Sequence, residues 1–136
     1  MRGWLLGILI VTLLQAPGCS SSDHELMEIR NTLTTRANAL NSKNITQYLS
    51  VVSLHYNDKG KYFAPLRESL EKNFRDFEQI SYEAGTPTIT IDGNHAGSTG
   101  SYRMKVQVRG KEMSLNGTEH LRLAKEPEGW KIIAGI

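Results

Sequence analysis

Two carboxylate side chains of this sequence could act as a base in a pocket, and Glu119 is the stronger candidate. In an extended strand it shares a face with Leu121 and Leu123, because side chains two residues apart point the same way. A carboxylate among apolar neighbours must be paired with a cation or hold its proton more tightly. The alternative is a β-bulge near Gly117 that reverses the alternation and turns Glu119 to solvent, and this is the arrangement we expect.

Asp58 is the second candidate base, and three tyrosines are candidates for binding a ligand. Asp58 belongs to segment 55–60, whose Asn, Asp and Gly residues are typical of a turn, so a turn role is the favoured alternative. A tyrosine can line a pocket because it joins an apolar ring to one hydroxyl. The candidates are Tyr48, Tyr56 and Tyr102. A place in the core or at a rim is their alternative, which we favour somewhat.

No complete catalytic motif accompanies these residues. The four histidines are widely spaced, the patterns H-E-x-x-H and G-x-S-x-G do not occur, and Cys19 is the only cysteine. We therefore predict no metal site and no cofactor. We also predict a binding role rather than catalysis.

The amino-terminal segment has the features of an export signal. A positive residue, Arg2, precedes an apolar-leaning run from Trp4 to Leu14, and small residues follow at positions 16–18. The run is shorter than the roughly 20 apolar residues that cross a bilayer as a helix. The sequence thus predicts a signal peptide over residues 1–18.

Residues 16–19, Ala-Pro-Gly-Cys, resemble the bacterial lipobox, although Ala16 replaces its usual leucine. The resemblance implies that Cys19 carries fatty chains, such as palmitate, and that a short tether, residues 19–22, holds the chain at the membrane of the cell envelope. In a Gram-negative cell, Ser20 after the cysteine implies the outer membrane, facing the periplasm. The alternative is an ordinary secretory cleavage that leaves a free thiol.

Length and composition predict one further domain, over residues 23–136. The 136 residues are 39% hydrophobic and carry a formal net charge of +2. These values are ordinary for a single globular domain. The near balance of charge gives no reason to expect a nucleic-acid partner.

The predicted elements are helices first and strands second. A helix of about five turns is predicted from the capping box Ser22–Glu25, with Arg36 among the residues off its apolar stripe. A second helix is predicted from its cap Asn44 to near Leu54, and a third from Pro65. The period then changes to two, which predicts about four antiparallel strands and an α+β fold.

Three helices, the turn at 55–60, four strands and the closing run Glu-Gly-Trp-Lys-Ile-Ile at 128–133 resemble the NTF2-like superfamily, also described as SnoaL-like. The resemblance implies an NTF2-like cone: three N-terminal helices packed on a strongly bent antiparallel sheet of about four strands, with a pocket at the open end. Such pockets host isomerases, dehydratases and hydrolases, but also binding and assembly domains. The fold therefore does not decide the function.

A row of basic side chains, the basic stripe, is predicted on the outer face of the sheet. In proteins of the similar superfamily this face often forms a homodimer, whose apolar core a charged stripe would make difficult. We favour a solvated face, and the alternative is contact with anionic headgroups or an acidic envelope partner. The stripe consists of Arg103, Lys105, Gln107 and Arg109 from one strand and His120 and Arg122 from its neighbour.

These patterns predict a lipid-anchored domain of the cell envelope that binds a small apolar ligand or an envelope protein and catalyses nothing. A small pocket enzyme with Glu119 or Asp58 as general base is one alternative. A structural subunit of an envelope complex is another. An apolar cavity of about a few hundred Å³ in the cone would support the ligand-binding role.

Overall fold

The computed structural model describes residues 20–136 and has the α+β class predicted from the sequence. The predicted signal peptide and Cys19 lie outside these residues. The helices are α1 (Ser21–Ser42), α2 (Ile45–Leu49) and α3 (Phe63–Asp76). The main sheet has β3 (Gln79–Ala84), β4 (Thr88–Asp92), β5 (His95–Val108), β6 (Lys111–Glu126) and β7 (Gly129–Ala134). Two short strands, β1 (Asn57–Asp58) and β2 (Lys61–Tyr62), form a hairpin.

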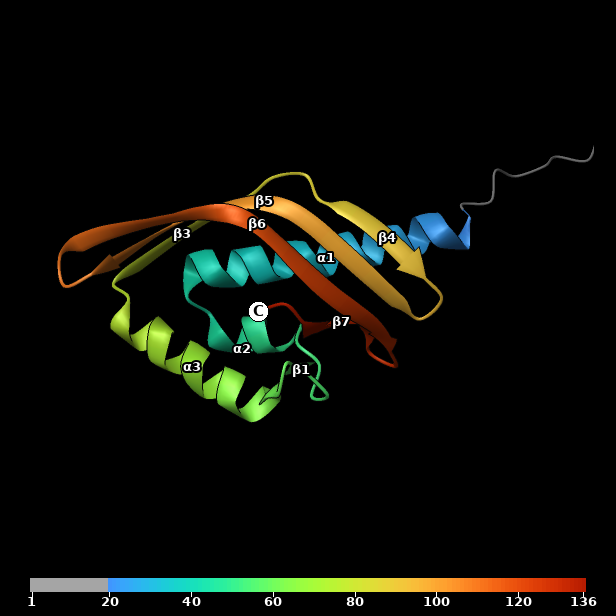
Figure 1. Cartoon of the computed structure of the whole chain (residues 1–136), viewed down its shortest axis with the longest axis horizontal. Coiled ribbons are helices and arrows are strands. Elements are labelled where there is room, and N and C mark those ends of the chain that lie inside the picture. The colour runs from blue at the N-terminus through green and yellow to red at the C-terminus, as the bar shows by residue number, and fades with distance from the viewer. Residues whose placement is uncertain (1–19) are drawn as a thin grey trace, which may run out of the picture.

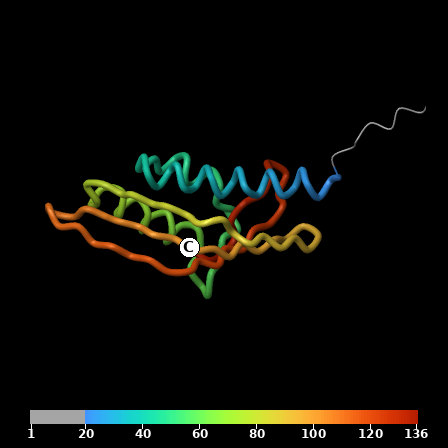
Figure 2. The backbone as a smooth tube through the Cα atoms, turned by 90° about the horizontal axis from the view of Figure 1, so that it is seen from above, coloured from blue at the N-terminus to red at the C-terminus, as the bar shows by residue number. Residues whose placement is uncertain are grey.

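The antiparallel sheet is curved, and the helices lie against its concave side (Figure 1). Helix α1 runs lengthwise beside the sheet and packs on β3, β7 and α2 (Figure 2). Both views place the start of α1 at one end of the long axis and the turn between β5 and β6 at the other. Within the described residues, no helix combines the length and apolar character needed to cross a bilayer.

The sheet has five strands rather than about four because one of its edges is broken. Strands β3 and β4 both pair with β5, β3 along residues 102–107 and β4 along residues 95–99. The break at residues 85–87 contains Pro87, which has no N–H to continue a ladder. Gly85 lies close to β5 at this break: an added Cβ would lie 2.4 Å from Ser101 Oγ, so the Ser101 side chain would have to rotate away.

The predicted helix starts are close to the observed ones but differ in detail. Helix α1 begins at Ser21, and the predicted capping box at Ser22 does not form: Ser20 is the N-cap residue and makes no side-chain capping bond. Helix α2 has the predicted cap, in which Asn44 Oδ1 accepts from the Gln47 N–H at 3.0 Å, but it ends at Leu49. Helix α3 begins at Phe63, two residues before the predicted Pro65.

The hydrophobic core lies between the helices and the concave face of the sheet, and strands β5, β6 and β7 contribute to it. Trp130 of the closing run is 2% exposed, and its indole Nε1 has no hydrogen-bond partner among residues 20–136. Tyr56 is also buried, and its hydroxyl bonds both the carbonyl and the N–H of Ile136 at 3.0 Å. Phe74 and Trp130 belong to this core and leave the wide end of the cone open.

Candidate functional site

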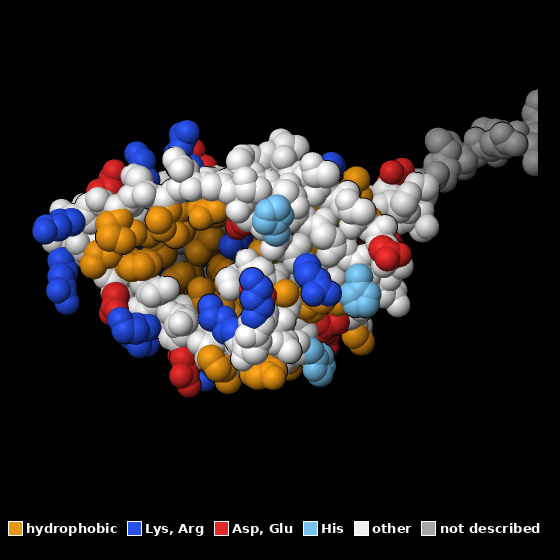
Figure 3. Space-filling view, in the orientation of Figure 1, with side chains coloured by type: hydrophobic (Ala, Val, Ile, Leu, Met, Phe, Trp, Pro, Cys, Tyr) orange, Lys and Arg blue, Asp and Glu red, His pale blue; other side chains and the backbone are white. Residues whose placement is uncertain are grey.

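A cavity of about 810 Å³, the cone cavity, lies between the concave face of the sheet and helices α2 and α3. Figure 3 shows it as a hollow below the sheet in which hydrophobic side chains gather. Its apolar wall includes Leu70, Phe74, Phe77, Ile80 and Met104. The size falls within the range of about 300–1,000 Å³ that is usual for small-molecule pockets.

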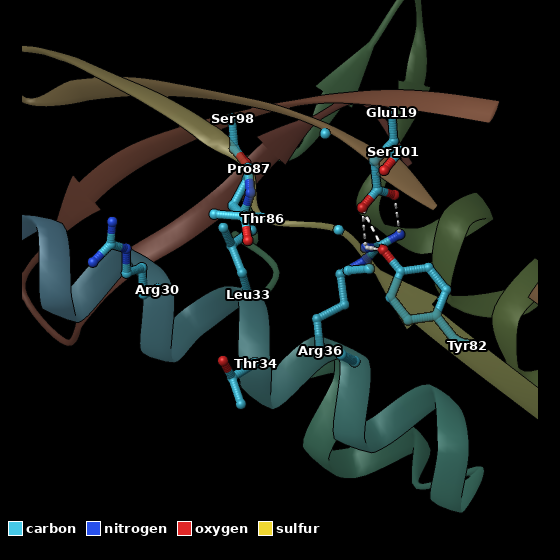
Figure 4. Close-up of a pocket in the computed structure, with 14 residues that line it drawn as sticks. Arg30, Leu33, Thr34, Arg36, Tyr82, Thr86, Pro87, Ser98, Ser101 and Glu119 are labelled. Atoms are coloured by element: carbon cyan, nitrogen blue, oxygen red, sulfur yellow. Dashed lines mark hydrogen bonds and ion pairs between the residues drawn. The ribbon is translucent and has the colours of Figure 1, made fainter. Parts of the chain in front are cut away.

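A cluster of four polar side chains forms the inner wall of the cone cavity. We call it the polar cluster, and its members are Arg36 of α1, Tyr48 of α2, Tyr82 of β3 and Glu119 of β6. Arg36 is 8% exposed and donates from Nη1 and Nη2 to the two carboxylate oxygens of Glu119, each at 3.2 Å. Figure 4 shows this pairing, with the Tyr82 hydroxyl beside it.

The tyrosine hydroxyls complete the cluster. Arg36 Nε donates to the Tyr48 hydroxyl at 3.0 Å, and Arg36 Nη1 donates to the Tyr82 hydroxyl at 3.3 Å. Tyr82 donates its own proton to Oε1 of Glu119. The guanidinium also lies over both rings, 5.8 Å from the Tyr48 centroid and 5.4 Å from that of Tyr82, so cation–π attraction adds to the ion pair.

Glu119 points inward because the β5–β6 ladder is continuous. Its register runs without interruption from His95 opposite Ala124 to Val108 opposite Lys111, with Gly100 opposite Glu119. The expected bulge near Gly117 is therefore wrong, and so is the expected exposure of Glu119. The irregularity lies instead between Arg122 and Leu123, where β6 pairs with β7.

The neighbours of Arg36 stabilise its charged, protonated form. Burial opposes the charged form, but Tyr48, Glu119 and Tyr82 outweigh burial, so the pKa of Arg36 lies above its ordinary value. Burial and the bond to Glu119 raise the pKa of Tyr82 to about 12, against the opposing effect of Arg36. At neutral pH Tyr82 therefore keeps its proton and remains a donor to Glu119.

The sequence pattern does not identify Arg36 as a site residue, because the apolar stripe predicted for α1 differs by about one position from the buried face of the helix. The apolar stripe predicted for α1 placed Arg36 off the buried side, whereas the buried side chains are Ile29, Thr32, Arg36, Ala39 and Leu40. Arg36 lies seven residues after Ile29 and four before Leu40, which is the spacing of one helix face. A buried arginine requires an acidic partner, and that requirement could have linked it to Glu119.

Of the other predicted site residues, all but Tyr56 line the cone cavity. Tyr48 and Tyr102 line the cone cavity, and the Tyr102 ring stacks on Tyr82 with centroids 6.3 Å apart. Tyr56 lies in the core and is not part of the lining of the cone cavity. Asp58 lines the cavity from the β1–β2 hairpin, which is the turn that the sequence predicted.

The basic stripe lies on the outer face of β5 and β6, where carboxylates interrupt it. Arg103 lies opposite Glu83 of β3, and Lys105 Nζ lies 3.9 Å from Glu112. Arg109 is in the β5–β6 turn with a positive φ of 51°. His120 and Arg122 continue the stripe on β6 as predicted: they lie opposite Thr99 and Gly97 of β5, and His120 Nδ1 is 3.1 Å from the Thr99 hydroxyl on the exposed face. No group of three or more potential metal ligands occurs within residues 20–136.

No family model and no curated protein matches this sequence. Solved structures of similar shape do exist. An NTF2-like superfamily protein from Salmonella enterica serovar Typhimurium has a TM-score of 0.76 and 16% identity, over 84% of this chain and 89% of its own. An NTF2-like protein with a cystatin-like fold from Novosphingobium aromaticivorans has a TM-score of 0.64 and 15% identity, over 82% and 79%.

A conserved protein from Planctomyces limnophilus has a TM-score of 0.72 and 17% identity, over 82% of this chain and 92% of its own. Identities this low establish shape and leave chemistry open. The three helices packed on a curved antiparallel sheet agree with these structures. The chain therefore has the NTF2-like cone fold.

Proposed function

We propose that this protein is a lipid-anchored domain of the cell envelope that binds a small, mainly apolar ligand in the cone cavity and does not transform it. The cavity supports this proposal by its size and by its wall of aliphatic and aromatic side chains. The ligand we expect has an apolar body of one or two rings and a hydroxyl or carbonyl group that faces the polar cluster.

The observation that carries the proposal is that the carboxylate of the polar cluster is already engaged by its neighbours. Both oxygens of Glu119 already accept hydrogen bonds, and the Tyr82 proton is already donated to one of them. A general base needs a free lone pair within reach of the substrate proton. Three of the about four lone-pair sites of Glu119 accept from Arg36 and Tyr82, so a single site on Oε2 is left for a substrate proton.

A general-base enzyme remains the second candidate, because Glu119 does lie in a cavity within hydrogen-bond reach of a tyrosine. This geometry is the minimum that a pocket base requires. The two functions differ in the fate of the ligand. Binding returns the compound unchanged after hours of incubation, whereas catalysis yields a product that depends on Glu119.

The binding test uses the full chain in phospholipid nanodiscs and 6-fluoro-2-naphthol, whose fluorine signal reports binding. Replacing Met104→Trp puts a bulky ring into the apolar part of the cone cavity and should weaken binding at least about tenfold, because the ligand loses apolar contact area. The control Met27→Trp places the same side chain on the exposed side of α1 and should change nothing. Equal affinity in the two variants, or no saturable binding above empty nanodiscs, would contradict the proposal.

The anchor is tested by labelling cells with radioactive palmitate. We expect label on the wild-type chain and none on Cys19→Ala, since one thiol is present to accept it. At least two fatty chains are needed for lasting attachment, so the labelled chain should resist extraction by salt. An unlabelled, freely released wild-type chain would remove the anchor from the proposal and leave the cavity unaffected.

A further inference from the structure

A second cavity, about 390 Å³, shares the polar cluster with the cone cavity. We call it the side cavity. It lies between α1 and the break that separates β3 from β4, and Figure 4 shows Leu33 rising from α1 toward Thr86 and Pro87 of the break. Arg36, Tyr82 and Glu119 line both cavities. The side cavity is thus a separate space on the opposite edge of the sheet from β7.

Two side chains that line the side cavity have an N–H or O–H group without an acceptor among residues 20–136, and the Ser98 hydroxyl is open to the cavity rather than enclosed. Ser98 is 5% exposed, and its hydroxyl has no hydrogen-bond partner among residues 20–136, although the side chain points into the cavity (Figure 4). Arg36 has five N–H groups, of which four bond Tyr48, Tyr82 and Glu119 within the described chain. Because both side chains line the cavity, an oxygen of a ligand bound there can accept from them.

The charge around the side cavity favours an anion. Arg36 and Glu119 neutralise each other through two hydrogen bonds. Arg30 also lines this cavity, and within residues 20–136 it takes part in no ion pair. The wall therefore carries one uncompensated positive charge beside an apolar surface that includes Leu33, Ala37 and Pro87.

We propose that the side cavity is a second binding site, specific for a compact carboxylate with an apolar body. The carboxylate would accept from the Ser98 hydroxyl and from the guanidinium of Arg30 or Arg36, both of which line the cavity. A charged acceptor makes the strongest hydrogen bonds with such donors. Its apolar body would lie against Leu33 and Pro87. This site is independent of the ligand proposed for the cone cavity, because their linings differ beyond the shared polar cluster.

The test titrates the full chain in nanodiscs with 4-fluorobenzoate and follows the fluorine signal. We expect saturable binding that weakens about tenfold in Ser98→Ala, the usual effect of removing one hydrogen bond to a charged group. Ala37→Met fills the side cavity and should abolish binding. Ser114→Ala, at an exposed serine of β6, is the matched control and should bind as the wild type does.

Two comparisons make the outcome specific. 4-Fluorobenzamide has the same shape without the charge and should bind at least about tenfold more weakly, because it offers no charged acceptor. Met104→Trp blocks only the cone cavity and should leave benzoate binding unchanged. Equal binding of the amide, no effect of Ser98→Ala and Ala37→Met, no saturable binding, or loss of binding in Met104→Trp would each overturn the proposal.

Discussion

The ion pair between Arg36 and Glu119 connects two elements that are 83 residues apart in the chain, α1 and β6. Glu119→Gln removes the counter-charge and leaves a buried guanidinium. We expect the free energy of unfolding to fall by about 2–3 kcal/mol, slightly less than the about 3–5 kcal/mol of a fully buried pair, because the Glu119 side chain is 20% exposed. Urea unfolding measures the change.

The control for this prediction is the same substitution in an Arg36→Met background. With no guanidinium to strand, Glu119→Gln should then lower the free energy of unfolding by less than about 1 kcal/mol. An equal loss in both backgrounds would mean that the two residues do not act as a pair.

Tyr82 predicts a pH dependence at the alkaline end. Its pKa rises from 10.0 to about 12 on folding, so the folded state holds the proton more tightly. The stabilisation is complete below pH 10 and is lost as the pH rises through 12, by about 2–3 kcal/mol in total. Urea unfolding between pH 9 and 12 should show a steeper fall for the wild type than for Tyr82→Phe, and parallel curves would contradict the assignment.

At the level of single residues, the sequence identified the acid of the site but not its partner. The alternation around Glu119 placed it on the apolar face, and only the assumed bulge at Gly117 turned it outward. One glycine does not predict a bulge, because a glycine also fits a regular strand. At Gly117 an added Cβ would lie 3.5 Å from the Tyr102 ring, which is an ordinary contact distance. Arg36 could not be assigned to the buried face of α1 from the sequence, because a charged residue is normally expected on the exposed face even where its spacing fits the buried one.

Among the elements, α2 is the one most dependent on a single side chain. It has five residues, and Asn44 supplies its N-terminal cap. We predict that Asn44→Ala lowers the free energy of unfolding by about 1 kcal/mol, the usual cost of a lost cap. Asn31→Ala, at an exposed position within α1, is the control and should cost nothing because alanine is the better helix former. Equal effects would show that the cap does not matter.

Element order and type were predictable, and boundaries were less so. Spacing at three and four residues located all three helices, and Leu66, Leu70 and Phe74 are buried in α3 as the pattern indicated. The start of α1 was misplaced because Ser20, Ser21 and Ser22 are equally good caps by residue type. The division of one sheet edge into β3 and β4 depends on how residues 85–87 meet β5, which is a long-range contact that no local pattern encodes.

For the whole molecule, the basic stripe gives a prediction about membranes. The two exposed cations of β5 face carboxylates, and Arg109 lies at the end of the molecule opposite the start of α1 (Figure 1). In the full chain carrying Cys19→Ala, replacing Arg103, Lys105 and Arg109 by Gln should change association with phosphatidylglycerol vesicles less than about twofold at 0.1 M salt, where exposed charges are screened.

Sedimentation with phosphatidylcholine vesicles is the control for this comparison. A fall of tenfold or more that is confined to phosphatidylglycerol would show that the outer face meets anionic lipid. That result would favour a domain lying along the bilayer rather than standing on its tether. It would also give the stripe a role that the paired carboxylates argue against.

The position of Trp130 provides a natural optical probe. Its indole is enclosed by the core, and its Nε1 has no hydrogen-bond partner in the described chain. Emission from such an indole should be blue-shifted and should move to longer wavelength when water reaches the ring. Because Trp130 lies on β7, against α1, its emission follows the parting of helix from sheet once Trp4, the other tryptophan of the sequence, is replaced by Phe. Every denaturation series proposed above can be recorded without attaching a dye.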